Sequence, residues 1–217
     1  MRCRFCHNPD TWDTHPDGKT DQWMTAEEVL ERALRYRSYW RGKGGITTSG
    51  GEPLLQMDFL TELFELAKRE GVNTALDTSA QPFSRNGDYL RRFDRLMAAT
   101  DLVLLDIKHI DPERHRWETG HDNANILDCA RYLSDIGKPV WIRHVLVPGI
   151  SSQDDCLIRL RRFLDTLTNV QRVDVLPYHT LGTFKWKELG VPYTLSDVTP
   201  PTEEMLAHAR EILQAGG

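Results

Sequence analysis

Two spacings of apolar residues alternate along the chain. Short, nearly continuous apolar runs are separated by longer stretches in which apolar residues recur every three or four positions. The short runs are typical of buried parallel strands, and the longer stretches are typical of amphipathic helices. The runs predict strands at 45–49, 72–78, 101–108, 139–147 and 170–176. The helical spacing predicts helices at 25–40, 58–70, 88–98, 123–134, 152–167 and 202–213.

Strands that alternate with helices in this way predict an α/β fold built from parallel βα units with right-handed crossovers. With 217 residues, the chain is short for an eight-fold barrel, which takes about 250 residues. A partial barrel and an open doubly wound sheet both fit. We expect a single domain over residues 1–217, with ligands gathered at the carboxyl ends of the strands.

Composition excludes several classes of protein. The net charge is −5 and no cluster of Lys and Arg stands out, so we expect no binding of nucleic acid. The chain has no apolar run of about 18 residues, which excludes a membrane span. The first residues carry no apolar leader, so we expect a cytoplasmic protein with reduced thiols. Cys129 and Cys156 lie on apolar helix faces and are predicted to be buried.

Polar and glycine residues follow each predicted strand. Any one of these strand ends could be an ordinary turn or a helix cap. Together, their charged and hydrogen-bonding groups would meet on one rim of the sheet. The strand ends are Ser49-Gly50-Gly51-Glu52-Pro53, Leu76-Asp77-Thr78, Asp106-Ile107-Lys108, Trp141-Ile142-Arg143-His144 and Leu176-Pro177-Tyr178-His179.

The N-terminus carries a pair of cysteines, Cys3 and Cys6, separated by two residues. This spacing suits an iron–sulfur cluster, a zinc ion or a redox dithiol. A zinc site needs further ligands, and the spacing of His7 and His15 matches no usual finger. A redox pair normally follows a strand, and none is predicted here. The residues alone favour a cluster but leave all three interpretations open.

The order of these motifs carries a family resemblance. The chain resembles the pyruvate formate-lyase activating enzymes of the radical SAM superfamily, over essentially its whole length. That resemblance implies a partial (β/α)6 barrel of the radical SAM type. The segments that carry it are Cys3-Arg4-Phe5-Cys6-His7-Asn8, Thr11-Trp12-Asp13-Thr14-His15, the five strand ends, Val147-Pro148-Gly149, Leu181-Gly182 and Lys185-Trp186.

The resemblance also implies a mechanism. Three cysteines hold a [4Fe–4S] cluster, and S-adenosylmethionine (SAM) chelates the iron that they leave open. An electron from the reduced cluster breaks the S–C5′ bond of SAM. The resulting 5′-deoxyadenosyl radical takes a hydrogen atom from the Cα of one glycine of a partner protein. The cofactors carry this chemistry, and the protein places them and excludes water.

Roles for single residues follow from the same resemblance. Phe5 would lie against the adenine, Gly50, Gly51 and Glu52 would hold the methionine amino group, and His179 would reach the adenosyl end. Arg143 would contact SAM or the partner. Asp77, Thr78, the carbonyl of Leu104 and Asp106 match a site for a monovalent cation. The predicted SAM-binding residues are Phe5, Cys6, Gly50, Gly51, Glu52, Asp106, Ile107, Lys108, Arg143 and His179.

One departure from the family concerns the cluster motif, Cys-x3-Cys-x2-Cys. Cys3 and Cys6 match its second and third cysteines, and the first would lie two residues upstream of Met1. The family's first strand would also lie upstream. We therefore expect an N-terminally truncated chain, either a fragment or a form that no longer activates anything, and we favour the fragment. With two thiolates, we expect residues 1–217 to hold a cluster poorly.

The remaining cysteines narrow the choice of partner protein. Activators of several other glycyl radical enzymes carry extra cysteines for a further cluster, whereas only Cys129 and Cys156 remain here. We expect pyruvate formate-lyase or a close 2-ketoacid formate-lyase as partner, a flavodoxin- or ferredoxin-type reductant, and a monomer. The alternatives are an activator of another glycyl radical enzyme, a non-catalytic metal-binding module built on Cys3 and Cys6, and a sugar-phosphate barrel enzyme.

Overall fold

The computed structural model describes residues 1–12, 22–42 and 44–216. Asp13, Thr14 and His15 of the family-like N-terminal stretch lie outside the described residues. None of the helices in the described ranges has the length and hydropathy of a bilayer span.

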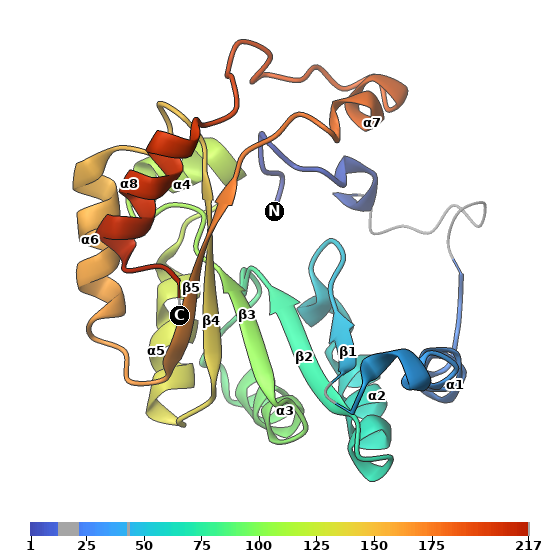
Figure 1. Ribbon diagram of the computed structural model, residues 1–217. Coiled ribbons are helices and arrows are strands. Elements are labelled where there is room, and N and C mark those ends of the chain that lie inside the picture. The colour runs from blue at the N-terminus through green and yellow to red at the C-terminus, as the bar shows by residue number, and fades with distance from the viewer. Residues whose placement is uncertain (13–21, 43, 217) are drawn as a thin grey trace.

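Five parallel strands form one sheet in chain order, as Figure 1 shows. They are β1 (Gly45–Thr48), β2 (Asn73–Thr78), β3 (Leu102–Asp106), β4 (Val140–Leu146) and β5 (Val170–Pro177). All five predicted strands are confirmed within a few residues. Each of the first four is followed by a helical segment that returns the chain to the start of the next strand, so the carboxyl ends of all five strands lie at one edge.

Eight short helices accompany the strands in the described part of the chain. They are α1 (Ala26–Leu34), α2 (Met57–Arg69), α3 (Gly87–Ala98), α4 (Pro112–Thr119), α5 (Ala124–Asp135), α6 (Asp154–Leu164), α7 (Thr183–Glu188) and α8 (Glu203–Leu213). Short 3-10 helices lie at Pro9–Trp12 (η1), Arg37–Trp40 (η2) and Pro53–Gln56 (η3).

The prediction of one helix over residues 25–40 is wrong in its second half. The helix begins as expected, because Thr25 and Glu28 form a capping box. It ends at Leu34, where the apolar stripe stops, and exposed Tyr36 then leads into η2, which carries the exposed Tyr39. Without an apolar face to bury, the continuation has no packing energy to hold it helical.

Two helices were missed. In α4 the buried residues are His115, Glu118 and Thr119, so no apolar stripe announces the helix. A local signal did exist, since Asp111 caps the helix and Pro112 is its first residue. The other missed helix, α7, has only 6 residues, which is too short for a helical periodicity of apolar residues to be detected.

Strand alternation separates the core from an inner face. In β4, Val140, Ile142 and Leu146 are buried with the helices, whereas Trp141, Arg143 and Val145 alternate with them on the other face. Neighbouring strands place Asp77 of β2 opposite Leu104 and Asp106 of β3 opposite Arg143. The register therefore brings charged residues from three strands to one inner face.

Residues 1–12 lie beside α7, above the carboxyl ends of the strands (Figure 1). The backbone of Arg2 and Arg4 donates to the carbonyls of Thr119 and Glu118, which ties the N-terminal segment to the end of α4. A second, smaller apolar cluster lies under this segment. It consists of Phe5, Val147, Tyr178 and Leu195.

Candidate active site

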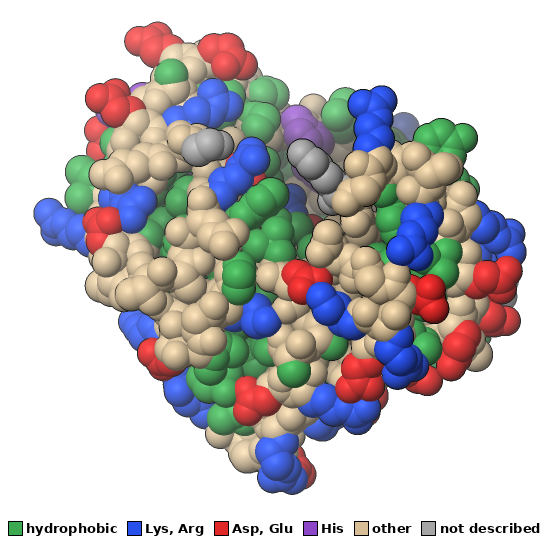
Figure 2. Space-filling view, turned by 60° about the horizontal axis from the view of Figure 1, so that its bottom comes forward, with side chains coloured by type: hydrophobic (Ala, Val, Ile, Leu, Met, Phe, Trp, Pro, Cys, Tyr) green, Lys and Arg blue, Asp and Glu red, His purple; other side chains and the backbone are tan. Residues whose placement is uncertain are grey.

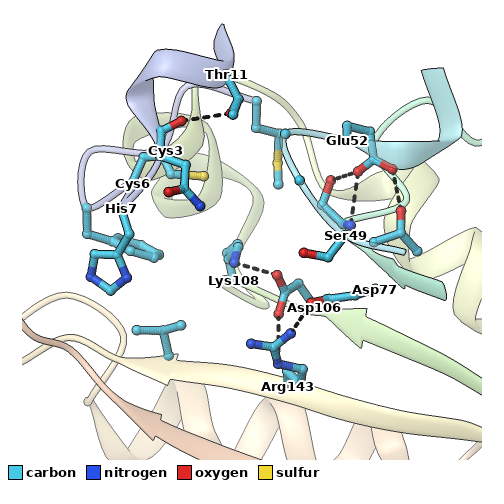
Figure 3. A pocket seen from close by; sticks show the side chains of 18 of the residues that line it. Cys3, Cys6, His7, Thr11, Ser49, Glu52, Asp77, Asp106, Lys108 and Arg143 are labelled. Carbon is cyan, nitrogen blue, oxygen red and sulfur yellow. Dashed lines mark hydrogen bonds and ion pairs between the residues drawn. The ribbon is translucent and has the colours of Figure 1, made fainter. Parts of the chain in front are cut away.

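A pocket of about 500 Å³ opens at the carboxyl ends of the strands, within the usual size range for a small-molecule site. Figure 2, which brings the lower side of Figure 1 forward, shows a hollow in the upper part of the molecule, and Figure 3 enlarges the pocket. All residues predicted for the site line it, except Ile107 and Leu104. The side chain of Ile107 packs in the main core instead.

Cys3 and Cys6 lie on one wall of this pocket, as Figure 3 shows. The amide of Cys6 donates to the carbonyl of Cys3 at 3.0 Å, which closes a tight turn and carries both thiols on one segment. Cys3 is buried and Cys6 is half-buried. Burial raises the pKa of the Cys3 thiol to about 12, although the nearby charge of Lys108 opposes this. Iron binding at Cys3 would therefore have to displace a tightly held proton.

Four charged side chains form a network across the inner face (Figure 3). Lys108 Nζ donates to Asp106 Oδ2 at 2.7 Å, and Arg143 Nη1 donates to Asp77 Oδ2 at 2.6 Å. Arg143 Nε also lies 3.9 Å from Asp106 Oδ1. The two cations and two anions balance, so the network carries no net charge while exposing both signs to the pocket.

Burial and ion pairing both shift the pKa values of the residues in this network. Burial raises the pKa of Asp77, the neighbouring Asp106 adds to that rise, and Arg143 opposes it. Burial alone would lower the pKa of Lys108, but the attraction of Asp106 and Cys3 outweighs it and holds the value above normal. Asp106 Oδ1 is buried and has no hydrogen-bond partner among the described residues. One strong acceptor in the network is therefore still available to a ligand.

The loop after β1 is held by Glu52 and lined by glycines. Glu52 accepts hydrogen bonds from the hydroxyls of Thr78 and Ser79, both at 2.5 Å, and from the amides of Ser79 and Leu54. Its carboxylate thus joins the end of β1 to the end of β2. Gly50 has φ +136°, where a side chain would be strained, and a Cβ on Gly51 would lie 3.0 Å from the carbonyl of Thr11. Glu52 and Gly51 serve the loop's own geometry as well as facing the pocket.

His179 also lines the pocket and stacks on His7, with ring centroids 3.9 Å apart. Burial, followed by the proximity of His7, lowers the pKa of His179. His179 Nδ1 is buried without a hydrogen-bond partner among the described residues, so it is a second polar atom available to a ligand. His7 was not among the predicted site residues, although it stands in the family-like N-terminal motif.

Two further features of the site were not foreseen. Phe5 lines the pocket but also belongs to the smaller apolar cluster, and Lys108 Nζ lies 5.6 Å from its ring centroid. Glu118 of α4 has both carboxylate oxygens buried and unpaired in the described part of the chain. Burial raises its pKa to about 8, against the opposing charge of Lys108. The sequence analysis did not single out Glu118, because it missed α4 itself.

The comparisons with known proteins agree on one family. Residues 1–160 match the family model for the radical SAM superfamily. The pyruvate formate-lyase-activating enzyme of Streptococcus mutans is 56% identical over 98% of this chain and 80% of its own length. That of Listeria monocytogenes is 48% identical over 99% of this chain and 85% of its own.

Solved structures give the same fold. A domain of a pyruvate-formate lyase-activating enzyme from Bacteroides vulgatus superposes with a TM-score of 0.65 and 25% identity, covering 79% of this chain and 93% of that one. A radical SAM methyltransferase from Sphaerobacter thermophilus gives 0.68 at 19% identity, over 98% of this chain and 59% of that one. The parallel sheet, with its thiol- and charge-lined pocket, is thus that of the radical SAM superfamily. Within it, the chain belongs to the family of pyruvate formate-lyase-activating enzymes.

Radical SAM enzymes use a [4Fe–4S] cluster and SAM, and the pocket has features that suit both. Cys3 and Cys6 present two thiols, and two orphaned polar atoms, Asp106 Oδ1 and His179 Nδ1, lie in groups that line the same pocket. Within residues 1–12, 22–42 and 44–216, no group of three or more His, Cys, Asp or Glu is arranged as metal ligands. Among the described residues that line the pocket, Cys3 and Cys6 are the two thiols that could hold a cluster.

Proposed function

We propose that this chain generates a glycyl radical on pyruvate formate-lyase, using SAM and a [4Fe–4S] cluster held in part by Cys3 and Cys6. One observation carries the proposal: the two thiols and the Lys108–Asp106–Arg143–Asp77 network line the same pocket. When bound, the cluster supplies the electron for reductive cleavage of SAM, which in turn supplies the oxidant that removes a hydrogen atom from a glycine Cα.

The network suits a zwitterion. A methionyl group carries an ammonium and a carboxylate, and the pocket offers both charge signs at fixed positions. Asp106 Oδ1 can accept a hydrogen bond from an ammonium or a ribose hydroxyl, and Lys108 keeps donors beyond its bond to Asp106. Because the network is already neutral, a net-neutral amino-acid group can bind without leaving an unpaired charge behind.

The part of the pocket lined by Phe5 and His179 suits the nucleoside. His179 Nδ1 has no partner in the described part of the chain, and its ring is held by the stack on His7. Phe5 offers an apolar wall fixed by the smaller core cluster. A ring nitrogen that is pre-positioned in this way can hydrogen-bond to an adenosyl group with little loss of rotamer entropy.

The proposal also covers the monovalent cation predicted at Asp77, Thr78, Leu104 and Asp106. Two carboxylates from adjacent strands support it, since hard cations prefer oxygen ligands. In the structure Arg143 pairs with both carboxylates, and the Thr78 hydroxyl donates to Glu52. A cation at this site would therefore join two carboxylates whose negative charge Arg143 already partly balances. Unchanged SAM cleavage in potassium-free and potassium buffers would contradict the cation site.

The identity of the partner rests on the relatives' names. Two curated relatives that the chain matches over nearly its whole length are named for pyruvate formate-lyase, which supports that enzyme over a different glycyl radical protein. A flavodoxin- or ferredoxin-type reductant, a cytoplasmic location and a monomeric state complete the proposal. The non-catalytic alternative would bind zinc at Cys3 and Cys6 without iron or sulfide.

The test compares two extended chains. One carries Cys-Ala ahead of Met1, which completes the Cys-x3-Cys-x2-Cys spacing, and its matched control carries Ser-Ala. Each is reconstituted anaerobically with iron and sulfide, reduced, and mixed with SAM and pyruvate formate-lyase. We expect SAM cleavage and the EPR doublet of a glycyl radical from the Cys-Ala chain, and much less from the control. A Cys-Ala chain that takes up iron and sulfide but neither binds nor cleaves SAM would refute the proposal.

A further inference from the structure

Residues 179–189, which follow β5, lie beside the N-terminal segment that carries the cysteine turn (Figure 1). The indole Nε1 of Trp186 donates to the carbonyl of Cys6 at 2.8 Å. Lys185 Nζ donates to Asn8 Oδ1 at 2.8 Å and pairs with Asp10 at 3.1 Å. The segment thus reaches Cys6 itself and the residues just after it.

Trp186 is held rigidly enough to act as a fixed support. Its side chain is 4% exposed. Its ring meets Trp12 edge-on at 4.9 Å between centroids and Tyr193 edge-on at 5.1 Å. The Tyr193 hydroxyl is in turn bonded to that of Tyr178 at 2.8 Å, within the smaller core cluster. The indole N–H therefore has little freedom to leave the Cys6 carbonyl.

The close approach of residues 179–189 to the cysteine turn also explains why position 182 is a glycine. A Cβ on Gly182 would lie 2.8 Å from the Cα of His7 and 3.0 Å from its carbonyl oxygen, so a larger residue would push the cysteine turn away. Next to it, His7 Nε2 lies 3.0 Å from the carbonyl of His179. Gly182, Lys185 and Trp186 all belong to motifs that the sequence singled out, and all contact residues 6–10.

We propose that Trp186, supported by Lys185, is a positioning residue for the cluster ligand Cys6. The hydrogen bond to the Cys6 carbonyl fixes the peptide plane that follows its Cα, while the turn bond to Cys3 fixes the plane before it. With both planes fixed, the direction of the Cα–Cβ bond, and so of the thiol, is set before any metal binds. The role as a cluster ligand rests on the proposed function, but the support of the Cys6 backbone does not.

The experiment uses residues 1–217 and the Cys-Ala extended chain, each with Trp186→Phe, with Lys185→Gln, or unchanged. Trp23→Phe is the matched control, because Trp23 is 82% exposed. The first readout is the alkylation rate of Cys6 in metal-free protein, measured by mass spectrometry far below the unfolding midpoint. Loss of one hydrogen bond predicts a rise of about threefold to tenfold for Trp186→Phe. The rise should be smaller for Lys185→Gln and absent for Trp23→Phe.

The second readout is spectroscopic. In the reconstituted extended chain, we expect Trp186→Phe to shift the EPR g-values of the reduced cluster and to lower bound iron, with Trp23→Phe unchanged. Alkylation rates and EPR spectra equal to those of the parent chain in both Trp186→Phe and Lys185→Gln would overturn the proposal. If the unchanged extended chain binds no cluster, the proposed function fails, whereas the alkylation rates still decide whether Trp186 supports Cys6.

Discussion

Replacing Glu118 by Gln should make the metal-free protein more stable, and the gain should grow with pH. Glu118 is 1% exposed, both of its carboxylate oxygens lack a hydrogen-bond partner in the described ranges, and burial raises its pKa to about 8 from 4.5. Between those two values the folded state holds a proton that the unfolded state has released. Wild-type stability must therefore fall as pH rises through that window. A neutral amide in the same place titrates in neither state.

The size of the effect follows from linkage. Each pH unit inside the window changes the free energy of unfolding by about 1.4 kcal/mol. From pH 5.5 to pH 8.5 the advantage of Glu118→Gln over wild type should grow by at most about 3 kcal/mol. Urea unfolding followed by far-UV circular dichroism at pH 5.5, 7.0 and 8.5 measures it. The control is Glu113→Gln, an exposed glutamate on the same helix. A difference between Glu118→Gln and wild type that stays constant across the three pH values would refute the reasoning.

Three further predictions concern the pocket. Glu52→Gln removes a carboxylate that accepts four hydrogen bonds; it should lower Tm by about 6–12 °C, whereas Glu62→Gln, exposed on α2, should leave it within about 2 °C. A Tm shift of equal size in both variants would mean that Glu52 does not hold the loop. Iodoacetamide at pH 8 should label Cys6 well before Cys3, whose pKa of about 12 keeps it protonated; equal labelling rates would contradict that burial. Lys108→Met leaves Asp106 without the 2.7 Å donor and should destabilise the chain by about 3–5 kcal/mol in urea unfolding. Stability within about 1 kcal/mol of wild type would show that Arg143 alone satisfies Asp106.

The strands and their order were predictable, because a buried parallel strand must be apolar over a short run whatever surrounds it. The prediction that Cys129 and Cys156 are buried is confirmed for the same reason, since each continues an apolar helix face. The prediction of helices failed where the buried face of a helix is polar. In α4 the buried face is His115, Glu118 and Thr119, and a hydrophobic pattern cannot reveal a helix whose inner face is polar.

For the candidate site, too, some features were predictable from the sequence and others were not. The sequence identified which strand ends carry Glu52, Asp106 and His179, but not what those groups bond to. Glu52 turned out to join two strand ends, and Arg143 turned out to pair with carboxylates from two other strands. Such pairings depend on which residues of neighbouring strands lie opposite one another. The paired residues are about 30 to 70 positions apart in the chain, so a local sequence pattern does not reveal them.

The sequence by itself determined the parallel α/β architecture, the family, and the residue types available at the rim, because periodicity and motif order are local properties of the chain. Only the tertiary structure decided which of those groups are neutralised, which are left with a free acceptor, and that Trp186 supports Cys6 from 180 residues away. The physical reason is that hydrogen bonds and charge pairing act over a few ångströms, so they depend on contacts that folding creates between distant segments.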